Sequence, residues 1–141
     1  MTDTLTLTRP DDWHLHFRDG AMLEETVPAT ARVFRRAIVM PNLTPPVTSV
    51  ALAEAYRERI LAAIPAGVDF EPLMVLYLTD ETPVEEIERA AQSPFVHAFK
   101  LYPAGATTNS DSGVTNPARI HHLYEALEKH DLPFLVHGEV T

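Results

Sequence analysis

Two histidines near the amino terminus, His14 and His16, have the type and spacing expected of metal ligands. Residues i and i+2 of a β-strand project from the same face, so both imidazoles are expected on one side of a strand. Neutral imidazole is the commonest protein ligand for zinc, at about 2.0–2.1 Å. Arg18 occupies the next alternate position, and Asp19-Gly20 predicts a turn. Histidine pairs also occur on strand surfaces, so the motif needs support from elsewhere in the chain.

Further reactive residues lie where apolar runs end. Asn42 follows the second of these runs, Lys100 ends the fourth and His137 ends the fifth. A lysine ammonium has no lone pair for a metal, but burial near cations lowers its pKa, and the neutral amine can react with carbon dioxide. The resulting carbamate is chemically a carboxylate and can bridge two metal ions. Two ions about 3.5–4 Å apart lower the pKa of bound water and polarise a carbonyl.

Short apolar runs alternate with helical patterns along the chain. Strands are predicted at residues 12–16, 36–40, 70–78, 96–102 and 134–137, with a further alternating strand at 4–8. Helices are predicted at residues 22–35, 50–63, 83–91 and 117–130. Apolar side chains recur every fourth residue of the second helix, and the predicted buried stripe is Leu52, Tyr56, Ile60 and Ile64.

Specific residues predict how these helices begin. Ser49 is a candidate N-cap for the second helix. Thr82 and Glu85 have the spacing of a capping box, which places Pro83 at the first helical position. Pro28 interrupts the first helical pattern and fits the first turn of a helix better than its interior.

The alternation of strands and helices predicts parallel βαβ units in an α/β fold. Two architectures fit this pattern, a doubly wound sheet and a (β/α)₈ TIM barrel. Five strands by residue 141 equally fit the first five-eighths of a barrel, which takes roughly 250 residues. The chain stops after the fifth predicted strand, so we expect residues 1–141 to be the N-terminal part of a single barrel domain.

Composition excludes several function classes. The net charge is −9, from 11 basic and 20 acidic residues, which argues against binding to nucleic acid or an anionic membrane. The chain has no cysteine, so thiolate metal sites are excluded. The amino terminus lacks the pattern of a signal peptide, and the longest apolar run, residues 73–78, is far too short to span a bilayer. The expected location is the cytoplasm.

Taken together, the motifs resemble the dihydroorotases of the amidohydrolase superfamily. The resemblance spans nearly the whole chain and is carried by residues 14–20, 40–43, 100–103, 107–109 and 135–139. It implies the barrel rather than the doubly wound sheet. It also implies zinc-dependent, reversible cyclisation of N-carbamoyl-L-aspartate to L-dihydroorotate in pyrimidine synthesis, with these small molecules as the binding partners.

The resemblance assigns roles to eight residues. The implied ligands of two zinc ions are His14, His16, carboxylated Lys100, which bridges the ions, and His137. Arg18 and Asn42 are implied to hold the substrate carboxylate, and a planar guanidinium fork suits that group. The remaining two, Thr107 and Thr108, are implied to lie on a lid that shields the substrate from water.

The family also uses a histidine at the end of strand six and an aspartate at the end of strand eight. That aspartate binds metal and transfers protons, and it is expected beyond Thr141, so no catalytic proton-transfer residue is assigned here. We therefore expect the 141 residues alone to be inactive and prone to self-association. Two alternatives stay open: a non-catalytic relic or interaction subunit of the same fold, and another cyclic-amide amidohydrolase such as a hydantoinase. A homodimer is also left open.

Overall fold

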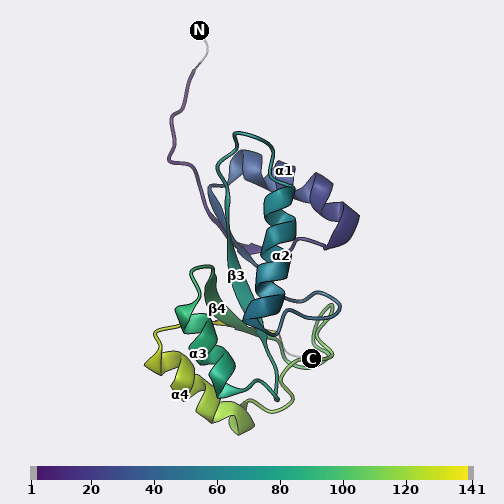
Figure 1. Ribbon diagram of the computed structural model, residues 1–141, viewed down its shortest axis with the longest axis vertical. Helices are drawn as coiled ribbons and strands as arrows, with labels where there is room; N and C mark the ends of the chain where they lie inside the picture. The colour runs from purple at the N-terminus through teal and green to yellow at the C-terminus, as the bar shows by residue number, and fades with distance from the viewer. Residues whose placement is uncertain (1–2, 140–141) are drawn as a thin grey trace.

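One parallel β-sheet organises the structure, a computed structural model that describes residues 3–139 (Figure 1). Its five strands lie side by side in chain order and are β1 (Asp12–Leu15), β2 (Arg36–Val39), β3 (Glu71–Leu78), β4 (Val96–Leu101) and β5 (Phe134–Val136). Every neighbouring pair is parallel. Because all strands run in the same direction, their carboxyl ends share one edge of the sheet.

Helices connect consecutive strands. They are α1 (Leu23–Val33), α2 (Val50–Ala62), α3 (Val84–Gln92) and α4 (His121–Lys129), with short 3₁₀ turns at Gly20–Met22 and Pro117–Ile120. In Figure 1, α2 crosses β3 and α3 lies along β4, in agreement with their contacts. Within residues 3–139, no helix combines the length and hydropathy that crossing a membrane requires.

Strand order decides between the two predicted architectures. A doubly wound sheet reverses its strand order at a switch point, where the helices change face. Here the order β1-β2-β3-β4-β5 never reverses, so successive right-handed crossovers place their helices on the same face. This is the winding of a TIM barrel, and the prediction of a barrel with five strands in this part of the chain is confirmed.

The core lies between the sheet and the helices. Leu76 and Phe99 from the sheet are fully buried against the cluster that includes Ile60 of α2, Ile87 of α3 and Leu123 of α4. Alternation along β4 then sends Lys100, the residue after Phe99, to the opposite face of the sheet. That face would be the interior of the barrel, and the packed helices hold it in place.

The predicted strand at residues 4–8 is wrong. The described part of this segment forms no strand, and Leu5 and Leu7 are 80% and 73% exposed. Period-two alternation makes a strand only where an edge is available to pair with, and the chain between residues 3 and 11 pairs with no strand of the described sheet. It is tethered instead by Arg9, whose guanidinium donates to Asp69 O at 2.8 Å.

The predicted first turn at Pro28 is also wrong, because α1 runs through this residue. The missing N–H of Pro28 would have bonded the carbonyl of Glu24, which is an exposed residue near the start of the helix. Water can satisfy that carbonyl, so the proline is tolerated.

Of the two other predicted helix starts, the structure confirms the one at Ser49 and contradicts the one at Thr82. Ser49 caps α2 as predicted, accepting from Leu52 N at 3.3 Å. Leu52, which was predicted to be buried, is 44% exposed, and the neighbouring Ala53 is buried instead. The capping box at Thr82 does not form, because its hydroxyl accepts from Thr79 N at 2.9 Å in the preceding turn.

Candidate active site

His14 and His16 project together from the region of β1, as their spacing predicts. Their Nε2 atoms are 3.0 Å apart, and the backbone N–H of His14 donates to Asp12 Oδ1 at 2.9 Å. A separation of 3.0 Å lets one ion lie about 2.0–2.1 Å from both nitrogens. Burial is the main cause that lowers the pKa of each imidazole, with Lys100 contributing to both shifts. Both rings are therefore biased toward the neutral form that can donate a lone pair.

Lys100 lies on the inner face of β4 and is only 2% exposed. Its Nζ donates to Val136 O at 3.1 Å and lies 5.4 Å from the centre of the Tyr102 ring. Burial lowers the pKa of its ammonium, which raises the fraction of neutral amine. The chemistry of this position therefore fits a lysine that reacts with carbon dioxide.

His137 follows β5 directly and lies near Lys100. The ring of His137 is 5.9 Å from that of Tyr102, and its Nε2 is 2.6 Å from Glu139 Oε2. The backbone N–H of His137 donates to Leu101 O at 2.9 Å, which extends the pairing of β4 with β5. The imidazole is thus held at the carboxyl edge of the sheet, where its ring nitrogen contacts a carboxylate.

One hollow of about 300 Å³ gathers nearly all of the predicted site residues. Its lining residues are His14, His16, Arg18, Asn42, Tyr102, Thr107, Thr108 and His137. Lys100 is not among them, but its neighbours Val136 and Tyr102 place it next to this lining. Within residues 3–139, no three His, Cys, Asp or Glu side chains are grouped closely enough to hold a metal ion.

The histidines of this hollow come from opposite edges of the sheet. His14 and His16 come from β1, at one edge of the sheet, whereas His137 follows β5, at the other edge. Both edges nevertheless line one hollow, because the sheet curls. Curvature, rather than strand adjacency, brings the two ends of the chain segment together.

Asn42 and the loop at residues 103–114 close one side of the hollow. Asn42 follows β2, is 3% exposed and donates from Nδ2 to Thr108 O at 3.0 Å. In return, Asn109 Nδ2 donates to Asn42 O at 3.0 Å, from a backbone with a φ of +54°. The loop is therefore attached to the β2 end of the sheet through paired amide contacts.

Tyr102, which lines this hollow, and Tyr77, which stacks on it from outside the lining, were not predicted from the sequence. Tyr102 donates to Asn42 Oδ1 at 3.1 Å and stacks on Tyr77, with ring centroids 5.0 Å apart. The Tyr77 hydroxyl lies 3.4 Å from Asn109 O. The available signal was the period of two, because Tyr102 comes two residues after Lys100 and shares its face.

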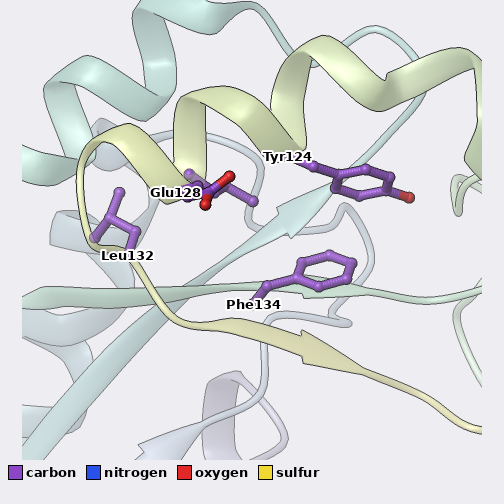
Figure 2. A pocket seen from close by; sticks show the side chains of 5 residues that line it. Tyr124, Glu128, Leu132 and Phe134 are labelled. Atoms are coloured by element: carbon purple, nitrogen blue, oxygen red, sulfur yellow. The ribbon is translucent and has the colours of Figure 1, made fainter.

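A second hollow lies on the other side of the sheet and is apolar. Figure 2 shows Tyr124, Glu128 and Leu132 from α4 and its end, with Phe134 of β5 opposite them; Leu127 completes the lining. Phe134 pairs in register with Phe99, which faces the helices, whereas Leu135 pairs with Lys100. This groove therefore opens on the helical side and shares no residue with the candidate site.

Comparison with known proteins identifies the class of protein that has this fold and this site. The sequence profile of the amidohydrolase family matches residues 11–140, and the chain belongs to that family. It is 79% identical over all 141 residues to the dihydroorotase of Alcanivorax borkumensis and 67% identical over the same length to that of Methylobacillus flagellatus. The chain spans 41% of the length of each of these curated relatives.

Comparison with solved structures agrees with the comparison of sequences. A dihydroorotase from Campylobacter jejuni superposes with a TM-score of 0.84 at 40% identity, over 94% of this chain and 39% of that one. A dihydroorotase from Saccharomyces cerevisiae in complex with 5-fluoroorotic acid gives 0.85 at 32% identity, over 94% and 36%. An L-hydantoinase from Arthrobacter aurescens gives 0.73 at 17% identity, over 93% and 29%, which shows a shared fold alone.

Proposed function

We propose that the protein is a dihydroorotase, which interconverts N-carbamoyl-L-aspartate and L-dihydroorotate. The observation that carries this proposal is the 79% identity to a dihydroorotase along all 141 residues. The hydantoinase alternative has weaker support, since that likeness is 17% and extends to the fold alone. The proposed partner is thus a small molecule. A cytoplasmic location and a homodimer stay predictions.

Two zinc ions are the cofactor that we propose. His14 and His16 would hold one ion, His137 the other, and carboxylated Lys100 would bridge them. The residues fit this role in two respects: the two Nε2 atoms are 3.0 Å apart, and the Lys100 amine is buried with a lowered pKa. His137 must exchange its contact with Glu139 Oε2 for the ion. Bound zinc supplies an activated water and a polarised amide carbonyl.

The remaining residues bind and orient the substrate. Arg18 and Asn42 line the hollow and would hold the substrate carboxylate, for which a guanidinium fork and an amide N–H₂ are suitable donors. Thr107 and Thr108 would cover the bound ring and exclude water. The yeast relative's ligand, 5-fluoroorotic acid, is a pyrimidine carboxylate and so supports a site of this chemistry. We place the proton-transfer aspartate outside these 141 residues.

Hydrolysis of dihydroorotate by the full-length gene product, in zinc and bicarbonate, tests the proposal. Lys100→Ala should abolish turnover, because the bridging group is lost. The chain has one other lysine, the exposed Lys129, and Lys129→Ala is the matched control that should keep full activity. Hydantoin is the competing substrate. Faster turnover of hydantoin, or full activity in Lys100→Ala, would contradict the assignment.

A further inference from the structure

The side-chain amide of Asn42 has a defined orientation, which its hydrogen bonds reveal. An asparagine amide has an acceptor end, Oδ1, and a donor end, Nδ2, which differ chemically although they have the same shape. In this structure Oδ1 accepts from the Tyr102 hydroxyl at 3.1 Å, and Nδ2 donates to Thr108 O at 3.0 Å. A flipped amide would set Oδ1 against the Thr108 carbonyl oxygen, which repels it, whereas the Tyr102 hydroxyl can accept as well as donate.

Tyr102 is well suited to enforce this orientation. Its side chain is 1% exposed and is stacked on Tyr77 at an interplanar angle of 27°, so its hydroxyl has little freedom to move. From this fixed place the hydroxyl donates to Asn42 Oδ1, while the Thr108 carbonyl, which can only accept, takes the donor end of the amide.

The donor end of Asn42 is thereby directed to two tasks. Nδ2 carries two hydrogens, and Thr108 O takes one of them. Asn42 and Arg18 both line the hollow, and within residues 3–139 Nδ2 makes no second hydrogen bond, so its other hydrogen is available to an anionic ligand there. The same orientation holds Thr108, and with it the segment 107–109, at the mouth of the site.

We propose that Tyr102 is a positioning residue that acts through Asn42: its hydroxyl fixes the amide so that the N–H₂ group faces both the substrate carboxylate and the Thr108 carbonyl. This inference rests on the proposed function and deepens it, because it adds a residue that sets the affinity for a ring carboxylate. We assign Tyr102 a role through Asn42 and not a contact of its own with the reacting atoms.

The test compares Tyr102→Phe with Tyr77→Phe in the full-length gene product. Each variant keeps its ring in the same stack and loses one hydroxyl, but the Tyr77 hydroxyl makes only a long contact with Asn109 O, at 3.4 Å. We expect Tyr102→Phe to raise KM for dihydroorotate and Kd for 5-fluoroorotate about tenfold, the equivalent of one hydrogen bond, with kcat reduced less than about threefold. Tyr77→Phe should change each value less than about threefold. Equal effects in the two variants would overturn the proposal.

A double-mutant cycle tests whether Tyr102 acts through Asn42. In an Asn42→Ala background the amide is gone, so adding Tyr102→Phe should change KM less than about twofold. Independent, multiplicative losses would show that Tyr102 acts by another route and would overturn the proposal.

Hydrogen exchange keeps this inference separate from the proposed function. If the unaltered protein neither turns over dihydroorotate nor binds 5-fluoroorotate, the proposed function fails, whereas exchange at residues 103–114 still reports on the amide. Tyr102→Phe should then speed exchange in this loop at least about fivefold relative to Tyr77→Phe, because the Asn42–Thr108 contact is no longer oriented. Unchanged exchange would overturn the link between Tyr102 and the loop.

Discussion

Replacing Lys100 with methionine should separate the stability of the fold from its chemistry. The Lys100 side chain is 2% exposed, and within residues 3–139 its ammonium donates one hydrogen bond, to Val136 O at 3.1 Å. Losing that bond costs about 1.5–3 kcal/mol, whereas removing a buried charge relieves a desolvation penalty of several kcal/mol. Methionine has similar length and fills the same space. We therefore expect the free energy of unfolding of Lys100→Met to equal that of the unaltered protein or to exceed it by up to about 2 kcal/mol.

The measurement is urea unfolding of the full-length gene product at pH 7 in chelator, so that bound metal does not add to stability. Lys129→Met, on the exposed side of α4, is the control and should stay within about 0.5 kcal/mol. In zinc and bicarbonate, the Lys100→Met protein should show no turnover of dihydroorotate. A loss of more than about 3 kcal/mol would refute the reasoning, because it would show that the ammonium is a structural partner. Retained turnover would refute the chemical role.

Three other perturbations address the core, a surface ion pair and the substrate carboxylate. Ile60→Ala, on the buried face of α2, should lower the free energy of unfolding by about 2–5 kcal/mol in urea, whereas exposed Leu61→Ala should cost less than about 1 kcal/mol; equal losses would contradict the packing described. Arg59 lowers the pKa of Asp19, so Asp19→Asn should reduce the melting temperature at pH 7. That difference should fade as pH falls from the ordinary aspartate pKa of about 3.9 through the lower pKa of the folded carboxyl, and a pH-independent difference would contradict the ion pair. Arg18→Ala should raise KM for dihydroorotate about 10–100-fold, with a smaller effect on kcat, because a charge-assisted contact is lost; an unchanged KM would remove Arg18 from the site.

Elements defined by local chemistry were predictable from the sequence. Ser49 accepts a hydrogen bond from the first turn of α2, as its side chain predicts. β2 to β5 form from runs rich in residues that favour a sheet buried on both faces, whereas β1 contains Asp12 and His14. The failures have separate causes: residues 4–8 find no strand to pair with, the residue whose carbonyl Pro28 leaves without a donor, Glu24, is exposed, and the Thr82 hydroxyl accepts from Thr79 N instead.

The types of the candidate site residues and their places at strand ends could also be read from the sequence. The alternation of His14, His16 and Arg18 puts these side chains on one side of the chain, and all three line the same hollow. The sequence could not give the partners of the site residues. The contacts of Lys100 with Val136 O and of Asn42 with Tyr102 and Thr108 join positions 36, 60 and 66 residues apart.

The sequence by itself thus determined which residues can do chemistry and that they follow parallel strands, because side-chain period and turn propensity are properties of a few neighbouring residues. Only the tertiary structure decided between a doubly wound sheet and a barrel, through a strand order that never reverses. It also decided that β1 and β5, at opposite edges, supply one hollow. Sheet curvature and the orientation of the Asn42 amide arise from packing summed over many distant residues, so no local pattern encodes them.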